Sequence, residues 1–377
     1  MMDIFWIATI LLFLAYSIEI IGAGYGLKKY RSPVLEDSFQ PISDKILVSV
    51  IIALRNEESN ILQLIEQLKN QNFPDSEFEV IFINDHSTDN TLKILQENCN
   101  ATKFRYLNLI DGSKGKKAAL EFGIGEANGD LILSTDADCQ LSPNWINAFY
   151  TSFISNHHPK LILGIVDMQH ISGFFQEFQR FNLLSMVFTG IGKAVFNKPV
   201  LNNGANLAYQ KGLFSDKSIM QNKHASGDDI FLLHYVKKHF KRKIKICIEK
   251  DSVVYTKPQK SVGEFIQQHI RWGSKAKHYK DFDTIWLTLV VFGFNLAIVC
   301  AFVIAFLTQN FYFVLGLYLG KSLVDVLFFA RANKYLDKPV MIEKIFIYQL
   351  FYPLYISMLG IAANVIPYRW KGRNKLR

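Results

Sequence analysis

Two aspartates separated by one residue, Asp136 and Asp138, follow directly after the apolar run at 131–135. A hard divalent cation such as Mg²⁺ binds one or two protein carboxylates and completes its shell with water and phosphate oxygens. Such an ion can offset the negative charge that develops on a departing diphosphate. Paired aspartates are also common on exposed loops, but these two lie at the end of a buried-type strand. The sequence therefore predicts a metal and phosphate site at this position.

A second acidic pair, Asp228 and Asp229, precedes the apolar stretch at 230–233. Acidic residues stabilise the N-terminus of a helix, so capping alone would explain the pair. The alternative is catalytic, with one carboxylate taking a proton from an acceptor hydroxyl. The residues by themselves leave both interpretations open.

Two single side chains have the chemistry of a nucleotide site. Asp85 lies in the turn-like sequence at 84–87, where it can accept a hydrogen bond from a base or sugar or simply stabilise the turn. Lys116, within the sequence at 114–117, can pair with a phosphate or remain solvated on the surface.

A third group, Gln268, Arg271 and Trp272, combines an amide, a guanidinium and an indole ring. Arginine binds phosphate through two parallel hydrogen bonds, and tryptophan offers a ring for stacking. An interfacial Arg/Trp anchor ahead of a membrane span would explain the same residues.

Residues from about 35 to 280 have the pattern of one α/β domain that can position these groups. Three apolar runs are typical of strands buried on both faces, namely 48–54, 79–83 and 131–135. Helices with apolar periodicity follow the first two runs, which predicts a doubly wound, mostly parallel sheet. Ligands bind such sheets at the carboxyl ends of the strands. The polar clusters at those ends are 55–60, 84–89 and 136–138.

Hydrophobic residues are concentrated at the two ends of the chain. Between Ile4 and Tyr25 the only acidic or basic side chain is Glu19, and basic residues follow at 28–31. At about 1.5 Å per residue this run can cross a hydrocarbon core of about 30 Å. A cleaved signal peptide is the alternative, but the first residues carry no Lys or Arg. We therefore expect an uncleaved anchor.

Three further candidate spans lie near the C-terminus, at 285–307, 311–330 and 345–365. The middle one carries Lys321 and Asp325 at i,i+4 spacing, which predicts a pair. Such a pair is either functional or a structural contact inside the bundle, and we expect the structural contact.

The basic residues that follow the first span place the middle domain on the cytoplasmic side. With four full crossings, however, the basic tail at 367–377 would lie on the opposite side. The number of C-terminal crossings therefore stays open. The apolar stripe at 174–195 also has two interpretations, a core helix or a helix at the membrane interface.

Composition excludes several classes of protein. Half of the 377 residues are hydrophobic and 14% are aromatic, which excludes a disordered or collagen-like chain. The net charge of +9 is not accompanied by a nucleic-acid-binding motif, so we expect a membrane partner and no nucleic acid. Four cysteines without CxxC spacing are not typical of a disulfide framework or a zinc site.

Taken together, these motifs resemble the membrane-bound branch of the family-2 glycosyltransferases, which includes cellulose and hyaluronan synthases and ceramide glucosyltransferase. The resemblance covers about residues 48–272. It rests on the ordered set Asn56-Glu57, Asn84-Asp85-x-Ser87-Thr88-Asp89, Gly115-Lys116, Asp136-x-Asp138, Gly204-x-Asn206, Asp228-Asp229 and Gln268-x-x-Arg271-Trp272.

The resemblance implies a GT-A fold, which is Rossmann-like with a mostly parallel sheet, flanked by transmembrane helices. The expected organisation is an anchor at 1–30, a cytoplasmic transferase domain at 35–280 with interfacial helices, about three spans at 285–366 and a basic tail at 367–377. It further implies an inverting enzyme with a UDP- or GDP-linked sugar donor and a divalent cation, Mg²⁺ or Mn²⁺.

The same resemblance assigns expected roles to individual residues. Asp229 matches the catalytic base, and Asp138 matches the metal ligand. The residues expected to bind the nucleotide sugar are Glu57, Asp85, Lys116, Asp136, Asp138, Gln268, Arg271 and Trp272. Those expected on the acceptor side are Gly204, Asn206 and Asp228.

Three functions are compatible with these motifs. We expect transfer to a lipid, lipid-linked or polysaccharide acceptor at the cytoplasmic membrane face, because three C-terminal helices form a narrow frame for a polymer channel. The alternatives are a processive polysaccharide synthase and a membrane protein that binds nucleotide sugars without catalysis.

Overall fold

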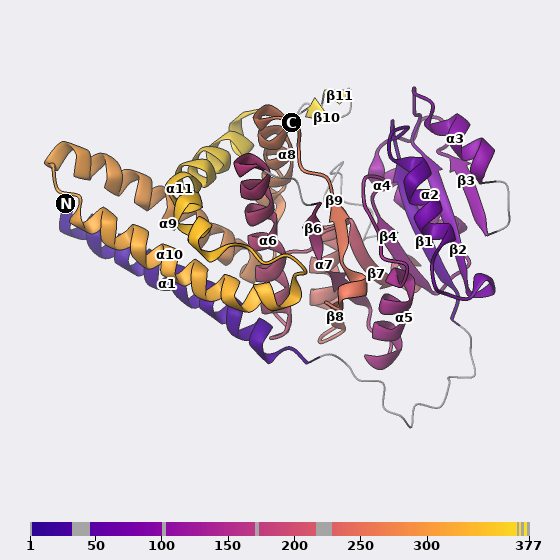
Figure 1. Ribbon diagram of the computed structural model, residues 1–377, viewed down its shortest axis with the longest axis horizontal. Coiled ribbons are helices and arrows are strands. Elements are labelled where there is room, and N and C mark those ends of the chain that lie inside the picture. The colour runs from indigo at the N-terminus through magenta and orange to yellow at the C-terminus, as the bar shows by residue number, and fades with distance from the viewer. Residues whose placement is uncertain are drawn as a thin grey trace. The chain divides into compact units, whose positions relative to one another are not determined.

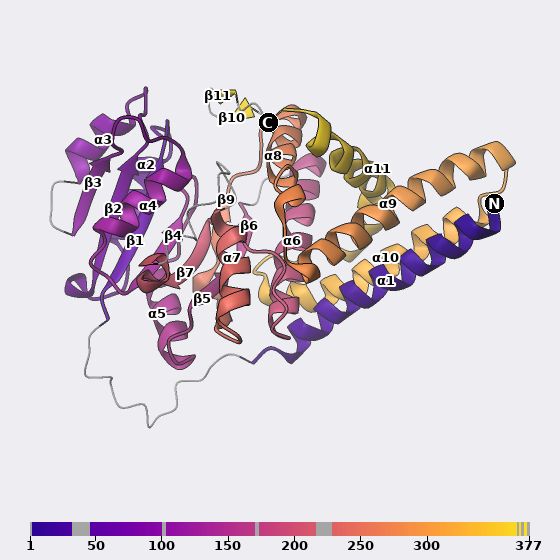
Figure 2. The same cartoon turned by 180° about the vertical axis from the view of Figure 1, so that it is seen from behind.

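The computed structural model describes residues 2–31, 46–99, 103–169, 173–215, 228–367, 369–370 and 373–374. The chain forms two compact units. We call one the helical unit, which comprises Met1–Tyr30, Ser172–Val200 and Gln259–Arg377, and the other the sheet unit, which comprises Arg31–Ile171 and Leu201–Pro258. Figure 1 labels their elements, and Figure 2 shows them from behind.

The sheet unit is built on a seven-stranded sheet. Its strands are β1 (Val48–Leu54), β2 (Phe78–Asn84), β3 (Phe104–Asn108), β4 (Leu131–Thr135), β5 (Leu161–Gly164), β7 (Asn206–Gln210) and β8 (Ile244–Cys247). They follow the order β3-β2-β1-β4-β7-β5-β8. Strand β7 is antiparallel to both neighbours, and the other neighbouring pairs are parallel. This confirms the mostly parallel sheet predicted from the sequence.

Burial explains why these segments form strands. Every residue of β2 and β4 is buried, as are six of the seven residues of β1, so both faces of the sheet centre are covered. Strands covered on both faces read as continuous apolar runs. A separate two-stranded sheet pairs β6 (Val166–Met168) with β9 (Val254–Thr256) in parallel.

The helices of the sheet unit follow the strands. They are α2 (Ile61–Lys69), α3 (Thr91–Asn98), α4 (Lys116–Glu126), α5 (Trp145–Ser155) and α7 (Asp228–His239). Helix α4 packs tightly on the sheet at Gly123, where a Cβ atom would lie 2.4 Å from Cδ1 of Ile83 and 2.9 Å from Cγ2 of Ile51. Because α4 runs back from the carboxyl edge of the sheet, this contact fixes its first residue, Lys116, at that edge.

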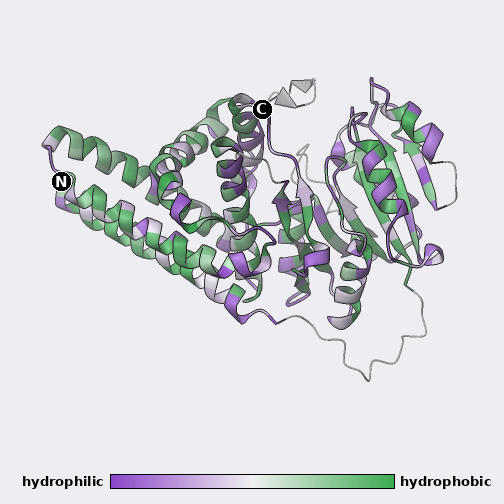
Figure 3. Ribbon diagram, viewed as in Figure 1, coloured by the Kyte–Doolittle hydropathy of each residue, from purple (hydrophilic) through white to green (hydrophobic). Residues whose placement is uncertain are grey.

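The helical unit contains α1 (Met2–Lys29), α6 (Phe174–Ala194), α8 (Val262–Gly273), α9 (Phe282–Thr308), α10 (Tyr312–Ala332) and α11 (Ile342–Val365). Helices α1, α9, α10 and α11 are long and apolar enough to cross a membrane. Figure 3 shows hydrophobic residues along all four. The two short strands β10 (Arg369–Trp370) and β11 (Arg373–Asn374) pair after α11.

Helix α6 is held against α1 by a close backbone contact. A Cβ atom on Gly26 would lie 2.0 Å from the carbonyl oxygen of Gly192, so glycine is required for this approach. Beside the crossing, Glu19 forms an ion pair with Lys193 and accepts a hydrogen bond of 2.9 Å from Nε1 of Trp286 on α9. The aromatic stripe of α6 is largely internal to the helical unit, because Phe178, Phe181 and Phe188 are buried.

The predicted pair of Lys321 and Asp325 is confirmed, with 2.9 Å between Nζ and Oδ2. Two residues distant in sequence complete the cluster. The Tyr16 hydroxyl donates to Oδ1 of Asp325 at 2.6 Å, and Lys321 donates to Oε1 of Gln349 at 2.7 Å. All four side chains are buried. The cluster therefore joins α1, α10 and α11 inside the bundle.

Candidate active site

The polar loops singled out in the sequence leave the same edge of the sheet. Leu54 is paired with Asn84, Ile51 with Ser134 and Thr135 with Asn206. The carboxyl ends of β1, β2 and β4 are therefore neighbours, and β7 begins beside the end of β4. This edge is where a parallel sheet places its ligands.

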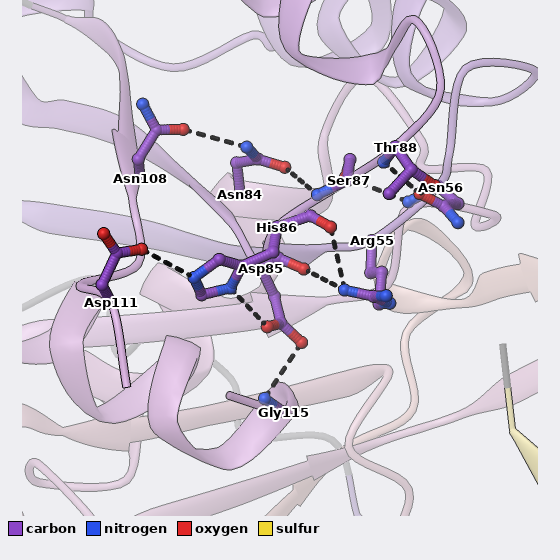
Figure 4. A network of polar contacts seen from close by, with 10 residues as sticks. All are labelled: Arg55, Asn56, Asn84, Asp85, His86, Ser87, Thr88, Asn108, Asp111 and Gly115. Atoms are coloured by element: carbon purple, nitrogen blue, oxygen red, sulfur yellow. Dashed lines mark hydrogen bonds and ion pairs between the residues drawn. The ribbon is translucent and has the colours of Figure 1, made fainter. Parts of the chain in front are cut away.

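Asp85 is the most buried acid of this edge, with a relative exposure of 1%. Figure 4 shows that its carboxylate lies between two segments of the chain. Its Oδ2 accepts a hydrogen bond of 3.0 Å from the backbone N–H of Gly115, and its Oδ1 lies 3.3 Å from Nδ1 of His86. Asp85 thus connects the loop after β2 to the start of α4.

Arg55 connects the loop after β1 to the same place. Its Nη1 donates to the backbone carbonyls of Asp85 at 2.8 Å and His86 at 2.9 Å. Both His86 and Asn56 have a φ of +53°, a left-handed backbone conformation that non-glycine residues seldom adopt. The Asn56 side chain supports this conformation by accepting a hydrogen bond of 2.8 Å from the backbone N–H of Thr88.

Glu57 is held between the loops after β1 and β2. Its backbone N–H donates to Oγ1 of Thr91 at 2.8 Å, and its Oε2 accepts from Nδ2 of Asn60 at 2.8 Å. Asn60 in turn accepts a hydrogen bond of 2.7 Å from Nζ of Lys257. These contacts fix the half-buried Glu57 carboxylate at the carboxyl end of β1.

Lys116 and Asp136 form an ion pair that joins the start of α4 to the end of β4. Both side chains are about one-third exposed, at 32% and 35%. The Lys116 ammonium is therefore accessible to an anionic group at this edge, and Asp136 holds it in position.

Asp138 is half-buried next to β9. Its Oδ2 lies 3.5 Å from Oγ1 of Thr256, and the neighbouring Cys139 thiol lies 3.9 Å from its Oδ1. Burial, together with the negative charges of Asp138 and Asp136, raises the pKa of the Cys139 thiol well above its ordinary value. Cys139 therefore stays protonated beside the acids.

Asp229, the expected base, sits at the first turn of α7. Its Oδ2 accepts a hydrogen bond of 3.1 Å from the backbone N–H of Gly204, and its Oδ1 accepts one of 2.9 Å from the N–H of Ile230. The Gly204 carbonyl accepts a hydrogen bond of 3.2 Å from Oγ of Ser134 on β4. Asp229 is thereby connected, through Gly204, to the same edge as Asp136 and Asp138.

Asn206, expected on the acceptor side, lies in the interior of the sheet unit with 0% exposure. Its Nδ2 donates to the carbonyls of Ile165 and Ser252, both at 2.7 Å, and its Oδ1 accepts from Nε1 of Trp145 at 3.0 Å. These contacts position the start of β7. The side chain of Asp228, which begins α7, lies outside the part of the chain that the structure describes.

Gln268, Arg271 and Trp272 are on α8 of the helical unit. Between them, the buried His269 donates from Nδ1 to the Phe265 carbonyl at 2.8 Å and accepts at Nε2 from Nδ2 of Asn182 on α6 at 2.9 Å. Burial is the main cause that lowers the pKa of His269 to about 4. The motif is therefore carried by a helix anchored on α6.

The sequence assigned no individual role to Arg55 or Thr256. Arg55 falls in the polar cluster 55–60, and a charge placed directly after a buried strand end is a recognisable signal. Thr256 could not have been found, because it reaches Asp138 across 118 residues of chain.

Comparisons with known proteins identify relatives of this chain. Residues 49–213 match the family model described as Glycosyl transferase family 2. A stretch of 125 residues is 30% identical to the poly(ribitol-phosphate) beta-N-acetylglucosaminyltransferase TarS of Staphylococcus aureus and covers 33% of this chain and 21% of TarS. The chain thus matches only about a fifth of that relative's length.

Two archaeal relatives match over longer stretches. Glycosyltransferase AglE of Haloferax volcanii is 25% identical over 60% of this chain and 71% of its own. A Methanococcus voltae protein, named as a diacetamido-dideoxy-glucuronosyltransferase acting on dolichyl N-acetylglucosaminyl phosphate, is 26% identical over 66% of this chain and 78% of its own.

Among solved structures, the mannosyltransferase PcManGT of Pyrobaculum calidifontis superposes with a TM-score of 0.56. The match covers 96% of this chain and 99% of that one at 14% sequence identity, so it shows the shared fold. That structure is a complex with GDP-Man and Mn²⁺.

Proposed function

We propose that this chain transfers a sugar, with inversion, from a nucleotide sugar to a lipid or lipid-linked acceptor at the cytoplasmic membrane face. The proposal starts from its membership of the family-2 glycosyltransferases and from its GT-A fold. The observation that carries the proposal is the grouping of Asp85, Lys116, Asp136, Asp138 and Asp229 along one edge of the sheet, in a chain with four apolar helices.

The donor side is formed by the loops after β1 and β2 and by the start of α4. Glu57 and Asp85 offer carboxylate oxygens to the N–H and O–H groups of a nucleoside. Lys116 offers a cation to the diphosphate. Its ion pair with Asp136 keeps the ammonium in place until the phosphate arrives.

The acids after β4 fit a divalent cation. No three His, Cys, Asp or Glu side chains within the described residues are grouped as a closed metal site. Mg²⁺ and Mn²⁺ in nucleotide sites need fewer protein ligands, because water and phosphate oxygens complete the shell. Asp138 would hold the ion, assisted by Asp136. When bound, the ion would supply charge stabilisation for the departing nucleoside diphosphate.

Asp229 acts as the general base in this proposal. Its backbone-anchored carboxylate, with Oδ2 on Gly204 and Oδ1 on Ile230, is held in one orientation. Each carboxylate oxygen can accept a second hydrogen bond, so Asp229 can still receive the proton of an acceptor hydroxyl. Gln268, Arg271 and Trp272 would contact the diphosphate and the acceptor end, and Asp228 and Gly204 would border the acceptor.

The names of two relatives support a lipid-linked acceptor. The Methanococcus voltae protein is named for a dolichyl-phosphate-linked substrate. An undecaprenyl-phosphate 4-deoxy-4-formamido-L-arabinose transferase of Proteus mirabilis is 36% identical over 26% of this chain and 31% of its own. The apolar helices would hold the chain in a membrane that contains such lipids. The GDP-Man bound to PcManGT supports a nucleoside diphosphate sugar as the donor of this chain, but it does not identify the sugar.

The proposal is tested by a donor screen on membranes that contain the protein. UDP- and GDP-linked sugars are supplied with Mg²⁺ or Mn²⁺, and released nucleoside diphosphate is measured. One donor should give release that Asp229→Asn abolishes. The matched control is Asp75→Asn, because Asp75 is exposed and precedes β2 at the opposite end of that strand. Absence of release with every donor would contradict catalysis and favour a nucleotide-sugar-binding protein.

A further inference from the structure

Helix α1 provides a scale against which the other membrane helices can be placed. At its C-terminal end, the Leu27 carbonyl accepts a hydrogen bond of 2.7 Å from the hydroxyl of Tyr335, just after α10. At its N-terminal end, the Trp6 ring lies 4.5 Å from the ring of Phe313, at the start of α10. Helix α10 therefore runs antiparallel to α1 along almost its whole length.

Helix α9 runs beside them in the same manner. Trp286, near the start of α9, donates a hydrogen bond to Glu19 of α1. Further along α9, a Cβ atom added to Gly293 would lie 3.5 Å from Cδ2 of Leu12. One end of this three-helix bundle holds the C-terminal ends of α1 and α10 and the N-terminal end of α9. We call it the linker end. From this end the chain continues into the sheet unit after α1.

The first half of α11 contacts this bundle partway along. Gln349 accepts a hydrogen bond from Lys321, whose partner Asp325 contacts the Tyr16 hydroxyl at 2.6 Å. On the scale of α1, residue 349 of α11 is therefore at the height of Tyr16.

The second half of α11 contacts the bundle at nearly the same height. A Cβ atom on Gly360 would lie 2.4 Å from Cδ2 of Phe292, the residue next to Gly293, which faces Leu12. From Tyr16 to Leu12, α1 advances by about 6 Å, whereas from Gln349 to Gly360 α11 advances by about 16 Å. Helix α11 thus lies across the bundle, and Figures 1 and 2 both show it crossing α9.

Both ends of α11 contact helices near the linker end. Near its start, Lys344 forms an ion pair with Glu177 of α6, and Arg180, one turn further along α6, donates a hydrogen bond to the carbonyl of Lys338, which follows α10. Near its finish, the Cβ of Ala363 lies 2.8 Å from the position of an added Cβ on Gly273, the last residue of α8. Helix α8 leads directly to the beginning of α9. The N-terminal and C-terminal ends of α11 therefore both contact helices next to the linker end.

We propose that α11 does not cross the membrane and instead runs largely along the membrane plane, with both of its ends next to helices of the linker end, α6 and α8. Its outward face is apolar and fits lipid acyl chains. The exposed side chains of this face are Ile347, Leu350, Phe351, Leu354, Met358, Ile361 and Val365. Length and hydropathy alone do not distinguish this helix from a span, because its 24 residues reach about 36 Å.

This arrangement decides the side of the C-terminal tail. With α1, α9 and α10 as the crossing helices, the tail lies on the same side as the sheet unit, and the N-terminus lies on the other. The basic residues Arg369 and Arg373 then share a side with Lys28 and Lys29, as the positive-inside rule requires. The conflict that four full crossings create is thereby removed.

The sidedness is tested by labelling single cysteines with a membrane-impermeant maleimide. The background carries Cys300→Ser, because Cys300 is exposed whereas Cys99, Cys139 and Cys247 are buried. In full-length chains, Asn374→Cys should be labelled only in inverted vesicles. Glu121→Cys on α4 is the control for the side of the sheet unit, and Asn310→Cys between α9 and α10 is the control for the opposite side.

Labelling of Asn374→Cys in spheroplasts, together with Asn310→Cys, would overturn the proposal.

A depth measurement gives a second, independent test. A fluorophore on Ile347→Cys, Leu354→Cys or Ile361→Cys should be quenched alike by lipids carrying a quencher at a fixed depth. The matched series on α9, Leu289→Cys, Phe302→Cys and Leu307→Cys, should show graded quenching. A gradient along α11 like that along α9 would contradict an in-plane helix. Neither test depends on sugar transfer.

Discussion

The carboxylate of Asp229 accepts a hydrogen bond of 3.1 Å from the backbone N–H of Gly204. Gly204 lies two residues before β7, which pairs antiparallel with β4. The contact therefore connects the first turn of α7 with the strand end that carries Asp136 and Asp138. A backbone donor also fixes the direction in which Asp229 presents its remaining lone pairs.

Replacement of Asp229 by asparagine should remove the proton acceptor while the side chain keeps its size and one of its two backbone hydrogen bonds, from Gly204 or from Ile230. General-base catalysis contributes about 10²- to 10⁴-fold, so kcat should fall by about that factor. Donor affinity, measured by titration of the unreactive nucleoside diphosphate, should stay within about twofold of wild type. A variant with normal kcat would show that another group takes the proton.

Replacement of Lys116 by methionine should weaken donor binding. A hydrogen bond between charged groups contributes about 1.5–3 kcal/mol, which corresponds to an increase of about 10- to 100-fold in the donor Kd. Lys93→Met, on the exposed face of α3, is the matched control and should leave the Kd unchanged. Equal affinities for the two variants would place the diphosphate away from Lys116.

The buried pair in the helical unit should show strong coupling between its members. Lys321→Met leaves Asp325 as an uncompensated buried charge and should destabilise the protein by about 3–5 kcal/mol. The double variant Lys321→Met/Asp325→Leu removes both charges and should recover much of that loss. Thermal unfolding in detergent measures both. If the double variant were less stable than Lys321→Met alone, the pair would not behave as a compensated ion pair.

The crossing of α1 and α6 should tolerate no added methyl group. Gly26→Ala would place Cβ 2.0 Å from the carbonyl oxygen of Gly192 and should lower the Tm of the protein. Gly22→Ala, one turn earlier on the same helix, meets no atom within 4 Å. It should raise stability by up to about 1 kcal/mol, because alanine is the better helix former. The two variants differ only in what the methyl group meets.

Stability should also depend on pH through His269. Its pKa is about 4 in the folded protein because burial disfavours the charged form, against 6.5 for the free side chain. Between these values the unfolded chain binds a proton that the folded chain does not. Stability should therefore fall as the pH drops from about 6.5 towards 4, by up to about 3 kcal/mol. His269→Gln should flatten this part of the pH profile, and an unchanged slope would assign it to other groups.

Local sequence patterns predicted the central strands, because β1, β2 and β4 are buried on both faces and read as apolar runs. Strand β3 was not predicted, since only Phe104 of its five residues is buried and no periodicity is visible. The i,i+4 spacing predicted the pair of Lys321 and Asp325. Their partners Tyr16 and Gln349 could not be predicted, because helix packing brings them from distant segments.

In the candidate site, too, local sequence patterns predicted some features, and others depend on how distant segments pack. The sequence placed Asp85, Asp136 and Asp138 at strand ends, because polar residues directly follow apolar runs. It could not show that Asp85 contacts Gly115 or that Asp229 contacts Gly204, since those contacts depend on strand order and on the antiparallel entry of β7. Nor could hydropathy show that α11 lies across the other long apolar helices.

The central claim is that the site at the carboxyl edge of the sheet, with Asp138 and Asp229, transfers a sugar from a nucleotide donor to a lipid. Its most direct test is incubation of wild-type membranes with a radiolabelled nucleotide sugar and Mn²⁺, followed by organic extraction and product sizing. We predict label in a single lipid-soluble product with wild type and none with Asp229→Asn. Label that forms a ladder of water-soluble polymers would contradict the lipid acceptor, and equal label with both proteins would contradict the site.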